Sequence, residues 1–185
     1  LLIFSTTIMS FAQQSSIKSF KGYFNFSYNE ENGSIKMEVK ELNREFLYVS
    51  SLSSGIGSND IGLDRGQLGG ERIVKFIKTG NKLLLVQPNQ DYRALTDNEL
   101  ERNSIEQAFA KSVLFGFPIQ QEKEGSYFID ITPFLLQDMH GVSNRLKQAG
   151  EGQYNLDKTK SAIWLERTKA FPKNVELDVL LTFSG

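Results

Sequence analysis

Alternation of hydrophobic and polar residues dominates this chain and predicts a mainly β structure. The clearest example is 175–183, where Val175, Leu177, Val179, Leu181 and Phe183 fall on one face of an expected strand. The same alternation, with turn residues between the runs, predicts two hairpins, 22–28 with 35–39 and 72–78 with 82–87. Further strands are expected over 46–50, 127–131 and 162–168.

Helix signals are few. The capping box from Thr96 to Glu99 predicts a helix start, and Thr132 followed by Pro133 predicts an N-cap with proline at the first helical position. We expect short helices over 96–112, 132–139 and 142–150. The fold class is therefore α+β, a mostly antiparallel β-sheet domain with two or three short helices.

A glycine-rich run at 54–71 separates two of the expected strands. It holds six of the fifteen glycines of the chain. Glycine reaches positive φ without steric cost, so this density indicates a backbone that turns repeatedly. Asp60, Asp64 and Arg65 lie inside the run, where a flexible linker would carry mainly serine and glycine. We therefore predict an ordered connection between two strands.

The phosphate-binding interpretations of this run fail on particular residues. A P-loop needs a Gly-Lys pair, and the chain has none. In the dinucleotide fingerprint the position three residues after Gly57 must be glycine, but here it is Asp60, whose carboxylate would repel a pyrophosphate. For the loop's own charges, we expect the Asp64 carboxylate to accept backbone N–H groups and Arg65 to tie the loop to a neighbouring carboxylate or carbonyl.

Composition excludes several classes of function. A formal net charge of -1 provides no overall field for nucleic acid or an anionic membrane. Cysteine is absent and His140 is the only histidine, so multi-histidine and thiolate zinc sites cannot form within this sequence. No Gly-x-Ser-x-Gly motif presents a nucleophile. We expect His140 to be a hydrogen-bonded structural residue at a helix end.

The first residues suggest a compartment. Residues 1–12 are uncharged and rich in apolar side chains, and Ser10 and Ala12 suit the small-residue positions of a cleavage site. This stretch is too short to span a bilayer. We interpret 1–12 as the remnant of a signal peptide and expect an extracytoplasmic protein, periplasmic or secreted. The alternative is an apolar first strand of the domain.

Several short motifs together resemble the DUF5117 family. The most distinctive is Ile61-Gly-Leu-Asp-Arg-Gly66, inside the glycine-rich run. The others occur in the family's order at 20–24, 47–57, 72–76, 89–94, 112–118, 130–132, 170–176 and 181–183. Each motif is weak alone, but together they cover roughly residues 17–185. The chain resembles a DUF5117 domain over 13–185, truncated at or near its C-terminal end.

The resemblance implies a role for a larger parent protein. In this family the domain precedes a zinc-dependent metallopeptidase domain with a His-Glu-x-x-His-x-x-Gly-x-x-His site, in secreted or periplasmic bacterial proteins. None of those motif positions exists here, so no catalytic or metal residue is assigned, and zinc is expected in the missing catalytic domain. The resemblance implies a noncatalytic N-terminal domain that packs against that catalytic domain and shapes its cleft.

The expected partners are this downstream catalytic domain and a peptide substrate, with no nucleic acid and no membrane span. The candidate loop or interdomain contacts are Asp60, Asp64, Arg65 and Arg93. In the interdomain interpretation, Arg65 projects toward the catalytic domain or its substrate. The alternative is an independent extracytoplasmic module whose glycine-rich loop binds a peptide or glycan.

Overall fold

The computed structural model describes residues 16–57, 59–90, 92, 95–108 and 111–185. The expected signal-peptide remnant at 1–12 and the candidate residue Arg93 lie outside these described residues.

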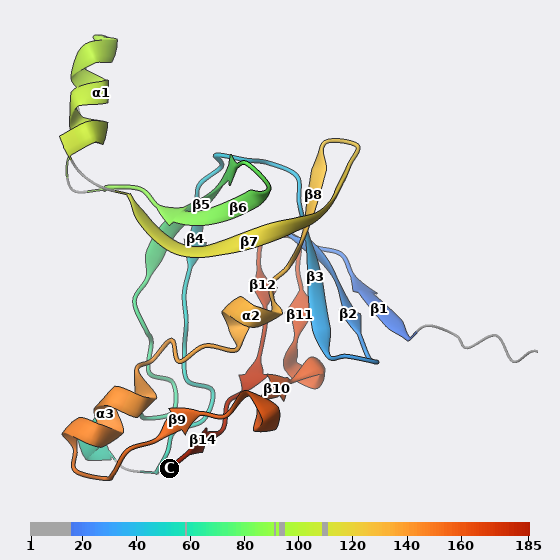
Figure 1. Cartoon of the computed structure of the whole chain (residues 1–185), viewed down its shortest axis with the longest axis vertical. Helices are drawn as coiled ribbons and strands as arrows, with labels where there is room; N and C mark the ends of the chain where they lie inside the picture. The colour runs from blue at the N-terminus through green and yellow to red at the C-terminus, as the bar shows by residue number, and fades with distance from the viewer. Residues whose placement is uncertain (1–15, 58, 91, 93–94, 109–110) are drawn as a thin grey trace, which may run out of the picture.

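An eight-stranded antiparallel sheet forms most of the molecule (Figure 1), and its strand order is β1-β2-β3-β8-β7-β6-β5-β4. This confirms the mostly antiparallel sheet expected from the alternation. The strands are β1 (Ile17–Phe20), β2 (Asn25–Asn29), β3 (Ser34–Val39), β4 (Phe46–Tyr48), β5 (Arg72–Thr79), β6 (Lys82–Gln87), β7 (Ser112–Lys123) and β8 (Ser126–Asp130). Both predicted hairpins are present, as β2–β3 and β5–β6.

The long strand β7 joins the two halves of the sheet. Its first part pairs with β6 and its second part pairs with β8. The register shifts between Leu85 and Val86 in the first pairing and between Ile119 and Gln121 in the second. Such irregularities bend a strand and increase its twist. The sheet therefore curls around β7 instead of lying flat (Figure 1).

Alternate side chains of the strands build the core. In β3, Ile35, Met37 and Val39 are buried, while the residues between them are half-buried. Aromatic rings fill the inside of the curl, and Phe117 contacts both Phe76 and Phe134 with ring centroids about 6 Å apart. Removing this apolar surface from water is the main stabilising contribution, about 1.5–3 kcal/mol for each fully buried large side chain.

The C-terminal segment is a long interrupted hairpin that packs against the core. Its arms pair in three short ladders, β9 (Asn155–Leu156) with β14 (Phe183–Ser184), β10 (Ala162–Ile163) with β13 (Val179–Leu180), and β11 (Lys169–Ala170) with β12 (Val175–Glu176). The expectation of continuous strands over 162–168 and 175–183 is wrong. Two 3-10 turns interrupt the first arm: η2 (Lys158–Lys160) lies between β9 and β10, and η3 (Leu165–Arg167) lies between β10 and β11.

Three α-helices are present among the described residues, each close to an expected segment. They are α1 (Glu99–Ala108), α2 (Thr132–Leu135) and α3 (Val142–Gln148). The predicted cap of the first helix is wrong by two residues: the Asn98 carboxamide, not the Thr96 hydroxyl, accepts the Leu100 N–H at 3.0 Å. In the part of the chain that is described, no helix has the length and apolar character needed to cross a bilayer.

The predicted cap of the second helix is also wrong. Thr132 is the first helical residue, and its hydroxyl accepts the Ile35 N–H of β3 at 2.8 Å. The helix ends at Leu135 and not near Met139. The hydroxyl is used to join α2 to the sheet, because the Ile35 amide needs an acceptor where β8 ends.

Candidate functional site

The glycine-rich run is a folded connection between β4 and β5, as predicted. Its two sides pair across the loop: the Leu52 N–H donates to the Gln67 carbonyl at 2.9 Å, and the Gly69 N–H donates to the Ser50 carbonyl at 2.7 Å. Leu63 at the loop's far end is almost completely buried, with 1% of its surface exposed. Backbone pairing and one buried leucine therefore give the loop a fixed shape.

Two glycines are required where the loop meets its neighbours. Gly62 has a φ of +69°, and a Cβ there would lie 2.9 Å from the Arg145 guanidinium. Its carbonyl accepts a hydrogen bond of 2.8 Å from Arg145 Nη1. At Gly69 a Cβ would collide with the Ser50 hydroxyl oxygen. The glycines thus allow close contact with α3 and with the start of the loop.

The helix that supplies Arg145 is capped at both ends. The Asp138 carboxylate accepts the Val142 N–H at 2.7 Å and the Ser143 N–H at 3.0 Å. At the other end Gly150 has a φ of +78°, and the Glu151 N–H donates to the Leu146 carbonyl, as in a Schellman motif. These caps hold the short helix and therefore hold Arg145 against the loop.

His140 lies in the turn between α2 and α3 and contacts the loop from the same side. Its ring is half-buried near Gly69, and it forms a hydrogen bond with the Ser51 backbone. Burial and the nearby Arg145 charge lower the pKa of His140, while Asp138 and the Ser51 bond oppose them. The environment is that of a structural histidine joining two segments.

The charged residues predicted from the sequence are less connected than expected. Asp60 lies in the 3-10 turn η1 (Asn59–Ile61) and is exposed, as is Arg65, while Asp64 is half-buried. Within the described ranges, none of the three side chains has a hydrogen bond or ion pair. The expectation that Asp64 accepts backbone amides through its carboxylate, and that Arg65 ties the loop, is therefore wrong. Asp64 contributes only its backbone carbonyl, which accepts the Gln67 N–H.

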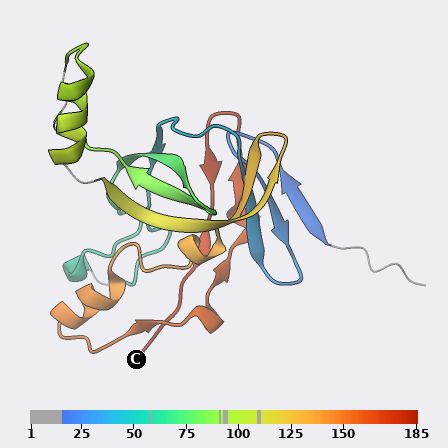
Figure 2. The same cartoon turned by 45° about the horizontal axis from the view of Figure 1, so that its top comes forward.

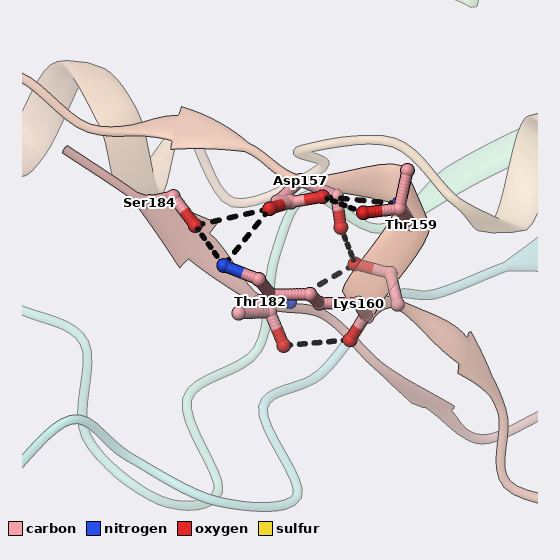
Figure 3. A network of polar contacts seen from close by, with 6 residues as sticks. Asp157, Thr159, Lys160, Thr182 and Ser184 are labelled. Atoms are coloured by element: carbon pink, nitrogen blue, oxygen red, sulfur yellow. Dashed lines mark hydrogen bonds and ion pairs between the residues drawn. The ribbon is translucent and has the colours of Figure 1, made fainter.

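A polar network holds the base of the C-terminal hairpin next to this region (Figure 3). The Asp157 carboxylate accepts hydrogen bonds from the Thr159 hydroxyl at 2.6 Å and the Ser184 hydroxyl at 3.1 Å. Its Oδ2 also lies 3.3 Å from Lys160 Nζ. The Thr159 hydrogen bond is the largest of the influences that lower the pKa of Asp157 to about 2. The network joins the two arms of the hairpin.

The contact of serine, lysine and aspartate in this network does not make a nucleophile. Lys160 is 62% exposed and ion-paired with Asp157, and Ser184 lies between them. A lysine that activates a serine sits in a desolvated pocket, away from a competing carboxylate. The cluster of Asp157, Lys160 and Ser184 joins β9 to β14, and we call it the latch. Nor do the described residues contain a group of three or more metal-ligating side chains that could hold an ion.

The glycine-rich loop, α3 and the β9–β14 ladder gather at one end of the molecule, together with Gly185 (Figure 1). We call this surface the loop face and define it by residues 54–57, 59–71, 142–148, 155–156 and 183–185. Gly185 packs against Tyr154, just before β9. Asp60, Arg65 and Glu71 are the exposed charged residues of the loop part of this face.

Comparison with known proteins identifies a family. Residues 66–185 match the family described as Domain of unknown function (DUF5117). This segment runs from the second half of the glycine-rich loop to the last residue and includes α3 and the whole C-terminal hairpin. No curated protein and no solved structure matches the chain. The chain therefore belongs to the DUF5117 family.

Proposed function

We propose that this domain is the noncatalytic N-terminal domain of a secreted zinc-dependent metallopeptidase, and that it packs against the catalytic domain through the loop face. Membership of the DUF5117 family supports the proposal, because the family resemblance implies that context. The zinc belongs to the catalytic domain in this proposal, and residues 1–12 direct the protein to an extracytoplasmic compartment.

The observation that carries the proposal is the fixed shape of the loop face, where the glycine-rich loop, α3 and the β9–β14 ladder lie together (Figure 1). The loop backbone is fixed by its own pairing and by Arg145, so it offers a surface that needs little ordering on contact.

The charged side chains of the loop support the same assignment. Asp60 and Arg65 are exposed, and the described residues provide neither with a hydrogen bond or ion pair. Charged side chains on a rigid loop, without structural bonds of their own, are available for contacts with another domain. The loop then shapes the peptide cleft from one side.

The gene provides the first test. We expect the reading frame to continue beyond the codon for Gly185 into a segment that encodes a His-Glu-x-x-His helix. A stop codon shortly after Gly185 would contradict the proposal and favour the independent binding module.

The enzyme provides the second test. In the complete protein, Arg65→Glu should lower peptidase activity or weaken domain packing, because it reverses a charge on the loop face. The matched control is Lys123→Glu at the β7–β8 turn, an exposed cation away from the loop face, which should leave both unchanged. Equal behaviour of the two variants would count against the loop face as the contact surface.

A further inference from the structure

A pocket lies at the other end of the molecule from the loop face, where the β1–β2 turn meets the connection from β3 to β4. It encloses about 170 Å³. Its lining includes Tyr23, Phe24, Glu38, Arg44 and Phe46. The tip of the β11–β12 hairpin stands at this end, while the C-terminus lies at the opposite end (Figure 2). The pocket is therefore separate from the surface assigned to the catalytic domain.

A carboxylate is fixed inside this pocket. The Asn25 side-chain amide donates to Glu38 Oε2 at 2.8 Å, and the Glu38 side chain is 18% exposed. Burial, the largest influence, acts to raise the pKa of Glu38, but hydrogen bonds from Asn25 and Ser126 and the charge of Lys40 together hold it below its usual value. Glu38 is thus an ionised acceptor held in one position.

The other charges of the pocket are already paired. Arg44 lies 2.9 Å from Glu41, and Lys40 lies 3.6 Å from Glu38, so two cations balance two anions. A charged ligand would have to separate one of these pairs. A neutral ligand with many hydroxyl groups can donate to the carboxylates and accept from Lys40, Arg44 and Asn25 without breaking either pair.

Aromatic rings supply the apolar part of the lining. The centroids of Tyr23 and Phe24 are 4.9 Å apart, and those of Phe24 and Phe46 are 5.2 Å apart, both in edge-on arrangements. All three residues are half-buried, so part of each ring borders the pocket. Aromatic surface beside fixed polar groups suits a ligand with apolar C–H faces and a rim of hydroxyls.

From this arrangement we propose that the pocket between the β1–β2 turn and the β3–β4 connection binds a neutral saccharide. The Glu38 carboxylate and the Asn25 amide orient the hydroxyl groups, and the rings contact the sugar's C–H surface. The proposal does not depend on the metallopeptidase role, since the pocket lies away from the loop face.

A second hollow extends the site for a longer ligand. It is a shallow, open depression at the tip of the β11–β12 hairpin and is lined by Phe171, Pro172 and their neighbours. The segments that line the two hollows are in contact, because the Tyr23 N–H donates to the Phe171 carbonyl at 2.8 Å. The Phe171 side chain is 39% exposed. An oligosaccharide with one unit in the first pocket reaches Phe171 with the next.

The test is titration of the full chain, labelled with ¹⁵N, with neutral methyl hexopyranosides of gluco, manno and galacto configuration and with the matching trisaccharides. We expect at least one series to shift the amide signals of Tyr23, Asn25 and Lys40, with a monosaccharide dissociation constant on the order of 1 mM. The trisaccharide should bind more tightly and also shift Phe171. Amides of the loop face, such as Gly62, should not move.

Variants assign the binding to the pocket. Glu38→Gln keeps the side-chain shape and should weaken saccharide binding about tenfold, because a charge-assisted hydrogen bond is lost. The exposed rim variant Glu41→Gln should weaken it less, and it provides a readout if Glu38→Gln does not fold. Phe171→Ala should weaken only the trisaccharide. The matched control is Glu122→Gln, an exposed carboxylate paired with Lys78, which should leave binding unchanged.

Three results would overturn the proposal. The first is that no saccharide of the panel shifts these amides. The second is that Nα-acetyl-lysine amide or a small carboxylate shifts them while the saccharides do not. The third is saccharide binding that is unaffected in both Glu38→Gln and Glu41→Gln.

Discussion

Asp138 and Asp64 are both half-buried aspartates beside the glycine-rich loop, but their carboxylates have different surroundings. Asp138 accepts two backbone N–H groups at the start of α3. Asp64 has no side-chain hydrogen bond or ion pair among the residues that the structure covers. The Asp138 carboxylate therefore contributes to the stability of the fold. The Asp64 carboxylate, without a bond of its own among the described residues, is available for contacts with another domain.

Replacing each aspartate by alanine tests this difference. Asp138→Ala should lower the free energy of unfolding by about 1–2 kcal/mol, the usual cost of losing a helix cap. Asp64→Ala should change it by less than about 0.5 kcal/mol, as for a residue without specific bonds. Urea denaturation of the two variants measures both values. Equal destabilisation would show that the Asp64 carboxylate is part of the loop's structure after all.

The sequence supports part of this residue-scale account. Glycine density predicts that the loop is folded, but Asp138 lies three residues before the N-cap Gly141, a position that the usual capping pattern does not include. The contact of Arg145 with Gly62 joins residues 83 positions apart, so no local pattern contains it. The pocket around Glu38 is equally hidden, because the β1–β2 turn and the β3–β4 connection meet only after the sheet forms.

At the scale of elements, the C-terminal hairpin depends on polar groups where its arms are irregular. Thr168 is buried, with 1% of its surface exposed. Its hydroxyl donates to the Trp164 carbonyl at 3.1 Å and accepts the Asp178 N–H of the opposite arm at 3.2 Å. One hydroxyl therefore satisfies two backbone groups where ladder pairing is interrupted.

Thr168→Val should destabilise the protein by about 1–3 kcal/mol, because it keeps the side-chain volume but removes the acceptor of the Asp178 N–H and one of the two hydrogen bonds to the Trp164 carbonyl, which also accepts the Arg167 N–H. Thr79→Val, at the exposed end of β5, is the control and should have little effect. Thermal and urea unfolding of both variants measure the difference. If the two variants unfold alike, the hydroxyl is not what joins the arms.

The latch at the hairpin base should respond to acid. The folded-state pKa of Asp157 is depressed from 3.8 to about 2, so its contribution to stability is present above pH 3.8 and is lost as the pH falls from there to about 2. Melting temperatures of the parent and of Asp157→Asn, recorded across this window, should converge as the pH falls. Curves that stay parallel would exclude the latch as the titrating element.

In β6 the adjacent Leu85 and Val86 are both buried, at the point where the register shifts. The alternation rule succeeds most clearly for β3, where every second residue is buried. It fails for β7, a strand that the pattern does not predict. This strand contains Gly116 and Pro118 and shifts register twice, so its side chains do not alternate simply. The final hairpin fails in the opposite sense. The alternation over 175–183 is regular, but the facing arm contains the 3-10 turns η2 and η3, so the two arms pair only in short ladders.

At the scale of the whole molecule, the proposed function assigns the zinc site to the catalytic domain and not to this chain. The isolated 185-residue chain should neither retain stoichiometric zinc after dialysis against a weak chelator nor hydrolyse peptides. One histidine and no cysteine cannot supply the ligand sets that zinc commonly uses in proteins. Metal analysis after dialysis checks the first point, and bound zinc at one equivalent would contradict it.

The central claim is that the loop face packs against the catalytic domain. Hydrogen exchange, followed by mass spectrometry, compares the complete protein with the isolated chain most directly. We expect peptides that cover residues 59–66 and 142–148 to exchange more slowly in the complete protein, because packing restricts opening of their backbone bonds. Peptides that cover β2 and the β1–β2 turn should exchange equally in both proteins. Equal exchange at the loop face, or protection confined to the opposite end, would contradict the account.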